Sequence, residues 1–426
     1  MRKRGFLILL GIVTLMALIN VIAWESTAFC DFYVRNIYPL CINLLGRVTE
    51  LFPFSVGEMM IVAGVIITAG ALLTGITALL CLPGYRRTKG ESPAQGNFPL
   101  NKKSGRYAKI MNFCKKYAAA YACIFTGVAV VMTLNCFIPY HCSAMEEKYG
   151  LLSQMPVDDP VLKELMTKDY TVEELGQLRD YVVIKANKLA KQVDRDENGD
   201  IIYPDNMEEL AVECMQNLSK DCDQLSGYYP RPKEFTFSGF FSQQKMKGYF
   251  FPFSMEVNYN GIMHEINRPA TICHEYAHLK GFMYEEEANM IGFLACINSS
   301  DVTFQYSGYL SILNYINNEF YDAIGRNKSI YAAHVKISPE VVAENVFLEK
   351  KAWEKVEAKA VIKTEVVDKV SDKLAETSMV LNGVEDGILS YTRVVGLLLN
   401  YYDGSPEVQN TLIEADYMQE YLVQSE

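Results

Sequence analysis

The apolar positions of this chain are concentrated in three long runs near its N-terminus. The runs Phe6–Trp24, Met59–Tyr85 and Tyr117–Met145 contain no Asp, Glu, Lys or Arg. As a helix rising about 1.5 Å per residue, each run can cross the roughly 30 Å hydrocarbon core of a bilayer. We therefore expect three transmembrane helices, over about residues 5–24, 58–83 and 117–139.

Basic residues around these runs predict the orientation of the chain. The first run follows Arg2, Lys3 and Arg4, but it is longer than the apolar part of a signal peptide and lacks a small-residue cleavage site, so we interpret it as an uncleaved anchor. The segment 86–116 carries nine Lys or Arg and one acid, whereas only Arg35 and Arg47 lie between the first two runs. Because cytoplasmic loops are enriched in Lys and Arg, we expect a multi-pass plasma membrane protein whose chain is extracytoplasmic from about residue 140 onward.

The pattern after residue 143 is that of an ordinary soluble domain, mainly helical with a small β-sheet. Apolar residues recur there at three- and four-residue steps, which predicts helices. The expected helices cover residues 157–193, 207–218, 269–280, 285–298, 304–324, 341–380, 389–402 and 406–422. Two short strands are expected within 235–260, and turns at Asn382-Gly383 and Asp386-Gly387. The segment 341–380 is rich in charge, so we interpret it as a solvated helical arm.

Charge excludes one class of partner. The chain has a formal net charge of −11, but residues 1–116 hold 14 Lys or Arg against 5 Asp or Glu, which leaves 26 against 46 for the remainder. A soluble part this acidic argues against nucleic acid as a partner. The eleven cysteines leave disulfide pairing open, and the oligomeric state is open as well.

The residues with the clearest chemistry are His274, Glu275 and His278 in the string HEYAH. On a helix, positions i and i+4 lie on one face, so both imidazoles can bind one metal ion. Zinc lowers the pKa of a bound water molecule, and Glu275 can accept its proton as the water attacks a carbonyl group. This pattern predicts a zinc-dependent peptidase, the alternative being a helix that carries two unrelated histidines.

A third protein ligand is expected after a turn at Gly281. The chain can turn back there, so that a carboxylate at the start of the next helix, Glu285 or Glu287, points at the metal. The string Glu285-x-x-Ala288-Asn289 is similar to the ExxAD element of the gluzincins. This resemblance implies that Glu285 is the ligand and that Asn289, in place of the usual Asp, supports a histidine ligand by a hydrogen bond.

Two further features fit a peptidase. Zincins bind the substrate backbone along an edge strand before the active-site helix, and Gly248–Asn258 has the right place in the sequence, although it would serve equally well as a core strand. Tyr306, His264 or Arg393 could stabilise the oxyanion, and of these we prefer Tyr306 as the catalytic partner of Glu275.

A separate acidic segment resembles a calcium-binding loop. Residues 194–205 match an EF-hand loop at several positions, but Asp stands at the last position, where Glu is usual. The candidate calcium ligands are Asp194, Asp196, Asn198, Asp200 and Asp205. We favour the alternative, an acidic Asn-Gly turn; a bound calcium ion would have a structural role.

The chain as a whole resembles a bacterial membrane family known as a domain of unknown function, with predicted zinc-peptidase character. The matching stretches are GYFFPFSMEVN at 248–258, HEYAHLKGFMYEEEANMIGFLAC at 274–296, FQYSGYL at 304–310 and NGVEDGILSYTRVVGLLL at 382–399. The resemblance implies a gluzincin-like site without naming a substrate.

We therefore expect a membrane domain over residues 1–142 and an extracytoplasmic, zincin-like α+β domain over residues 143–426. The function expected is cleavage of proteins or peptides at the outer face of the lipid bilayer. A membrane sensor with a zincin-like ligand-detecting domain is the alternative, although the segment 86–116 is too short to hold a folded effector. A purely structural zinc site would have no use for Glu275.

Overall fold

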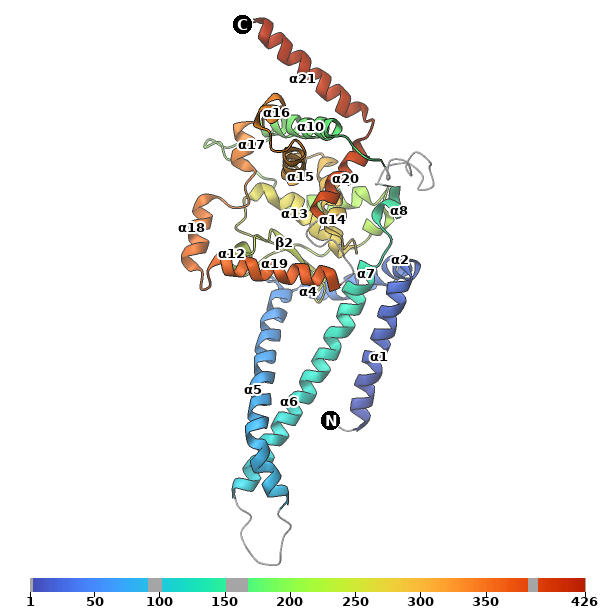
Figure 1. Ribbon diagram of the computed structural model, residues 1–426, viewed down its shortest axis with the longest axis vertical. Coiled ribbons are helices and arrows are strands. Elements are labelled where there is room, and N and C mark those ends of the chain that lie inside the picture. Colours follow the sequence, from blue (N-terminus) through green and yellow to red (C-terminus); the bar gives the residue numbers. More distant parts are fainter. Residues whose placement is uncertain (1–2, 91–101, 151–167, 382–389, 426) are drawn as a thin grey trace, which may run out of the picture.

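The computed structural model describes residues 3–90, 102–150, 168–381 and 390–425. It is mainly helical with one small sheet, as the sequence predicts. Figure 1 shows a globular part above three long helices. Part of the predicted helix 157–193, its first eleven residues, lies outside the described residues, as do the predicted turns between residues 382 and 387.

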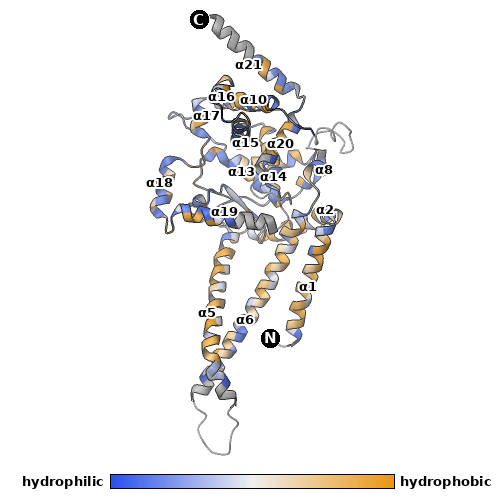
Figure 2. Cartoon of the chain, viewed as in Figure 1, coloured by the Kyte–Doolittle hydropathy of each residue, from blue (hydrophilic) through white to orange (hydrophobic). Residues whose placement is uncertain are grey.

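Within the described residues, three helices are long and apolar enough to cross a membrane, in agreement with the three apolar runs of the sequence. They are α1 (Lys3–Glu25), α5 (Val56–Gly90) and α6 (Lys102–Met132). The third continues through η2 (Thr133–Phe137) and α7 (Ile138–Tyr140) to the globular part. Figure 2 shows apolar residues along all three helices, and most of their large side chains are exposed. Such surfaces suit lipid rather than water.

Short helices join the first two spans at the globular end. They are α2 (Thr27–Asn36), α3 (Tyr38–Cys41), η1 (Ile42–Gly46) and α4 (Arg47–Thr49), and α8 (Met145–Tyr149) follows the third span. Tyr33, Tyr38 and Ile138 are buried in the same apolar cluster as Tyr276 and Phe293 of the globular part. The membrane region and the globular part therefore share one core.

The sheet has three strands in the order β1-β3-β2. These strands are β1 (Lys233–Glu234), β2 (Gly248–Phe251) and β3 (Glu256–Tyr259); β1 runs parallel and β2 antiparallel to β3. The two short strands predicted within residues 235–260 are confirmed as β2 and β3, whereas the helix α12 (Ser238–Gln243) in the same segment was not expected. The Glu58 carboxylate accepts hydrogen bonds from the backbone N–H groups of Thr236 and Phe237, at 2.7 and 2.9 Å, where this helix begins. Because Glu58 lies 178 residues before Thr236, this contact leaves no local signal in the sequence that would predict the helix.

The rest of the globular part is built from helices. The central ones are α13 (Arg268–Leu279), α14 (Glu285–Ile297), α15 (Val302–Ala323) and α20 (Ser390–Tyr402), which pack on one another as shown in Figure 1. Around them lie α10 (Val172–Ala190), α11 (Met207–Leu218), η4 (Asp223–Leu225), η5 (Glu265–Asn267), α16 (Lys328–Ala333) and α21 (Pro406–Ser425). All eleven cysteines are free thiols.

The predicted solvated arm over residues 341–380 is instead three helices that contact the domain. They are α17 (Pro339–Glu344), α18 (Lys350–Lys359) and α19 (Thr364–Leu381). Each buries one valine, namely Val341, Val356 and Val367. One small apolar contact per helix is enough to dock it, and so short a stripe is hidden among the many charged positions.

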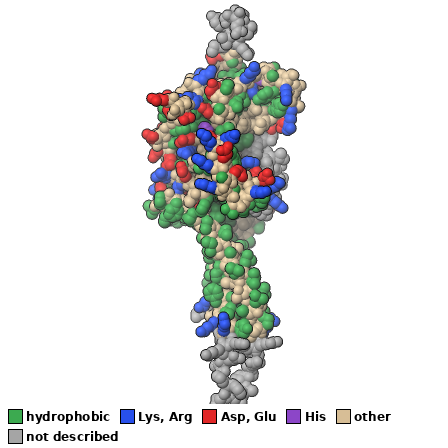
Figure 3. Space-filling model, turned by 90° about the vertical axis from the view of Figure 1, so that its left-hand side faces the viewer, with side chains coloured by type: hydrophobic (Ala, Val, Ile, Leu, Met, Phe, Trp, Pro, Cys, Tyr) green, Lys and Arg blue, Asp and Glu red, His purple; other side chains and the backbone are tan. Residues whose placement is uncertain are grey.

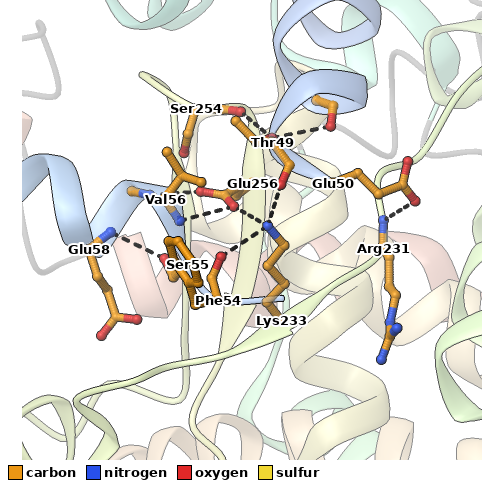
Figure 4. A network of polar contacts seen from close by, with 12 residues as sticks. Thr49, Glu50, Phe54, Ser55, Val56, Glu58, Arg231, Lys233, Ser254 and Glu256 are labelled. Atoms are coloured by element: carbon orange, nitrogen blue, oxygen red, sulfur yellow. Dashed lines mark hydrogen bonds and ion pairs between the residues drawn. The ribbon is translucent and has the colours of Figure 1, made fainter. Parts of the chain in front are cut away.

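A buried ion pair fixes the sheet to the start of the second span (Figure 4). Lys233 of β1 and Glu256 of β3 lie 2.5 Å apart, both almost fully buried. The Lys233 ammonium also donates to the carbonyl oxygens of Thr49 and Phe54. The Glu256 carboxylate accepts from the backbone N–H groups of Val56 and Gly57, at 3.2 and 2.7 Å. Since these are the first residues of α5, the anion also stabilises the positive end of that helix dipole.

Candidate metal centre

The helix that carries the histidines is well defined at both ends. Pro269 stands in the first turn of α13, where a missing N–H costs nothing. Gly281 follows the helix with φ of +94°, a conformation that favours glycine, and its N–H donates to the His278 carbonyl oxygen at 2.9 Å. This turn directs the chain into α14, whose first residue is Glu285.

The side chains of His274, His278 and Glu285 converge. The two Nε2 atoms are 3.1 Å apart, the Glu285 carboxylate lies 3.3 Å from His274 Nε2, and it lies 3.5 Å from His278 Nε2. Among the residues that the structure describes, these three form the one group of His, Cys, Asp or Glu side chains close enough to share a metal ion.

The spacing of this group fits a tetrahedral zinc ion. Two ligands that each lie about 2.0–2.1 Å from a tetrahedral centre are about 3.3–3.4 Å from each other. The three observed separations, 3.1, 3.3 and 3.5 Å, scatter about that value. Two imidazoles and one carboxylate also match the ligand types that zinc prefers, and they leave a fourth position open.

Hydrogen bonding orients His278 for this role. Its Nδ1 atom lies 2.8 Å from the Phe282 carbonyl oxygen, which selects the tautomer with the proton on Nδ1 and directs the Nε2 lone pair at the centre. Burial lowers the pKa of His278, but the hydrogen bond that its ring donates to the Glu285 carboxylate outweighs this effect and raises the pKa to about 9. Burial by itself would raise the pKa of Glu285. The hydrogen bonds that its carboxylate accepts from both histidines outweigh burial and hold this pKa well below its usual range.

Close packing of α13 against α14 sets the position of the third ligand. A Cβ atom at Gly292 would lie 3.1 Å from the His274 backbone nitrogen and 3.3 Å from the Ala270 carbonyl oxygen. Because only glycine avoids these contacts, the two helices approach closely enough for Glu285 to reach the histidines.

Glu275 lies between the helix and the edge strand β2. Burial raises the pKa of its carboxyl group, and the backbone N–H of Phe250 forms a hydrogen bond to it. A Cβ atom at Gly248 would lie 2.6 Å from the Glu275 carboxylate and 2.7 Å from the Thr271 methyl group. The glycine in β2 therefore makes the room that this carboxylate occupies.

The alternative ligand and the expected supporting residue do not join this group. Glu287 accepts the Met145 backbone N–H at 2.7 Å, so it caps the start of α8, and burial raises its pKa to about 8. Asn289 makes no hydrogen bond to either histidine within the described part of the chain. The structure thus brings Glu285, rather than Glu287, to the histidines.

Two of the three residues proposed to stabilise the oxyanion have other partners. The Tyr306 hydroxyl donates to Glu344 at 2.7 Å, and the same carboxylate pairs with Arg195 of the acidic loop. Arg393 lies 3.4 Å from Glu286, whereas His264 precedes the short helix η5 without a side-chain hydrogen bond to it. None of the three is part of the metal-ligand group.

The acidic loop has the geometry of a turn. Asp196 accepts the backbone N–H groups of Asn198 and Asp200 at 2.9 Å, and Gly199 has φ of +87°. Asp194, Asp200 and Asp205 are exposed, and the acids of this loop do not form a metal-ligand group among the described residues. The favoured interpretation, an acidic turn, agrees with this arrangement.

Sequence reasoning missed two tyrosines that lie beside the centre. Tyr249 of β2 is close enough to Glu275 and Glu285 to interact with their charges, and burial raises its pKa to about 12. Tyr140, the last residue of the third span, is in similar range of Glu285, and its carbonyl oxygen accepts from the Tyr284 hydroxyl at 3.0 Å. Tyr140 and His274 are 134 positions apart in the sequence, and no local signal connects them.

Comparison with known proteins places the chain in a family without an assigned activity. The family model described as "Protein of unknown function (DUF3810)" matches residues 33–399, most of the chain. The match runs from the short helices after the first span to the last central helix. Curated proteins give no match. Solved structures give no match.

Proposed function

Because the chain belongs to the DUF3810 family, whose function is unknown, its activity must be inferred from its own site, and we propose that it is a membrane-anchored zinc metallopeptidase. In this proposal the three spans cross the plasma membrane, and the globular part is a zincin-like domain on the extracytoplasmic side. The substrates are proteins or peptides at that face of the bilayer.

The observation that carries the proposal is the convergence of His274, His278 and Glu285 with a buried Glu275 next to them on the same helix. A structural zinc site is closed by four protein ligands, whereas a catalytic one keeps a position open. Here the described residues supply three. The Glu285 side chain is about one-third exposed, so the open position is accessible to solvent.

Each residue has a chemical task in peptide hydrolysis. Zinc held by the three ligands would supply Lewis-acid activation of water and of the substrate carbonyl group. Glu275 accepts the proton of the attacking water, a task that its burial favours because a desolvated carboxylate is the stronger base. Tyr249 keeps its proton at neutral pH, so its hydroxyl can donate a hydrogen bond to the carbonyl oxygen.

The edge strand supports substrate binding. Among the described residues, β2 pairs only with β3, and the backbone N–H of Phe250 in β2 hydrogen-bonds to Glu275 on the helix that carries the histidines. An extended peptide can add to such an edge through main-chain hydrogen bonds. This addition would place a scissile bond between β2 and the metal.

The test uses the full-length chain in detergent or nanodiscs. We expect about one zinc ion per chain in the wild type, loss of zinc in His278→Ala, and loss of peptide-library cleavage with zinc retained in Glu275→Gln. Glu286→Gln is the matched control, because Glu286 neighbours a ligand in sequence but pairs with Arg393. It should keep both zinc and cleavage.

The outcomes separate the alternatives. A wild-type chain without zinc would refute the metal centre. Zinc without any cleavage, across libraries and in both membrane mimetics, would refute the peptidase and favour a sensor whose metal centre detects a ligand.

A further inference from the structure

A group of exposed apolar side chains lies on the globular part where it meets the spans. Phe240 belongs to α12 and Phe237 directly precedes it, whereas Val361, Ile362, Val366 and Val370 belong to the start of α19 and the residues before it. Val361 is 98% exposed and Val366 52%. Figure 3 shows hydrophobic side chains gathered along the lower edge of the globular part, continuous with the spans. We call these six residues the apolar underside.

The length of the second span determines where the apolar underside lies relative to the bilayer. The apolar part of α5, Val56–Arg86, has 31 residues and is therefore about 46 Å long, close to the roughly 40–45 Å thickness of a bilayer with its headgroups. With Arg86 at one interface, the first turn of α5 lies at the opposite headgroup layer. Glu58 in this turn accepts the Phe237 backbone N–H, so α12 begins at that level.

Helix α19 is held against α12 at the same level. The Gln243 amide donates to the Ile362 carbonyl oxygen at 2.8 Å, and Lys245 pairs with Asp368 at 2.7 Å. In Figure 1, α19 lies across the direction of the spans, just above the end of α5. A helix in this position lies along a membrane surface rather than through it.

The two faces of α19 have different chemistry. Val367 and Asp368 face the domain, whereas Val366 and Val370, one turn apart, are exposed on another side. Lys369 and Lys373 are exposed next to this apolar stripe. Apolar side chains flanked by lysines are typical of helices that lie in a bilayer interface, where the ammonium groups reach the lipid phosphates.

We propose that the apolar underside inserts into the outer leaflet of the bilayer, so that α12 and α19 form a lipid-binding surface in addition to the three spans. Its partner is lipid, since the surface is continuous with the lipid-facing sides of the spans and lies at the height where α5 leaves the membrane. The exposed side chains of Leu51, Phe52 and Phe54, in the loop before α5, extend the same apolar surface. The proposal needs no catalytic activity.

The test measures the depth of single tryptophans in the full-length chain in nanodiscs. Trp24 and Trp353 are replaced by Phe, and tryptophan is introduced as Val366→Trp or Val370→Trp. Val342→Trp is the matched control, because Val342 is also an exposed helical valine, at 60%, but lies on α17, away from the spans in Figure 1. Phosphatidylcholine brominated near its headgroup reports contact with lipid, and acrylamide reports contact with water.

We expect brominated lipid to quench the tryptophans at 366 and 370 several-fold more strongly than the one at 342, and acrylamide to show the reverse order. Equal access of acrylamide to all three positions would overturn the proposal. A second result would also overturn the proposal. If the tryptophans at positions 366 and 370 are protected from both quenchers in discs that hold more than one chain, but are quenched by acrylamide in single-chain discs, the partner of this surface is a second copy of the chain. Circular dichroism of each variant checks that it is folded.

Discussion

Replacement of Gly248 by alanine tests whether the position of Glu275 controls catalysis. The added Cβ atom would lie 2.6 Å from the Glu275 carboxylate oxygen and 2.7 Å from its Cγ, whereas ordinary contacts begin at 3.4 Å. Either the carboxylate or β2 must therefore move by about 0.8 Å. A displacement of about 1 Å in a catalytic group costs roughly 100-fold in rate, or about 2.7 kcal/mol.

We expect kcat/KM for a cleaved peptide to fall by roughly 100-fold in Gly248→Ala, with zinc content unchanged, because the three ligands are not displaced. Gly239→Ala is the control: this glycine lies in the neighbouring helix α12, and its Cβ would meet no atom within 4 Å. Activity in Gly248→Ala equal to that of the control would refute this role of the glycine. Loss of zinc together with activity would show instead that α13 itself had moved.

Three further predictions concern the ligands and the junction with the membrane. Gly292→Ala should weaken zinc retention and lower the free energy of unfolding by about 1–3 kcal/mol, since its Cβ would press on the α13 backbone; metal titration and denaturation check this. Glu285→Ala should abolish zinc binding, whereas Glu287→Ala should keep it; equal losses would contradict the ligand assignment. Lys233→Met should destabilise the chain by roughly 3–5 kcal/mol, because it leaves the Glu256 carboxylate buried without its cation, and Lys233→Met/Glu256→Gln should cost less than the two single changes added together.

The part of the site within one short stretch of sequence could be predicted. His274 and His278 share a helix face by their spacing, and Gly281 provides the turn that brings Glu285 back. Because a few neighbouring residues determine the geometry of these three side chains, the sequence pattern alone is sufficient to predict it. The three spans were predictable for the same reason, because length and apolar character alone set whether a helix can cross a bilayer.

The part that depends on distant contacts could not be predicted. Tyr140 reaches the site from the end of a span, and nothing in its own neighbourhood marks it. Gly248 begins the predicted edge strand, but the sequence does not reveal that it makes room for the Glu275 carboxylate. Tyr306 is the residue preferred from the sequence for the oxyanion, but its hydroxyl donates a hydrogen bond to Glu344, 38 residues further on. Helix α12 was missed because Glu58, which binds the two backbone N–H groups directly before it, lies at the start of a span.

The shared core bears on how this protein can be divided for study. A fragment beginning at residue 143 would contain the whole HExxH motif, yet Lys233 and Glu256 would lose four backbone hydrogen bonds that come from residues 49–57. The apolar surface that covers Tyr33 and Ile138 would become open to water. The boundary between membrane and soluble sequence is therefore not a boundary between folding units, and we expect a soluble fragment cut there to aggregate where the intact chain in detergent does not.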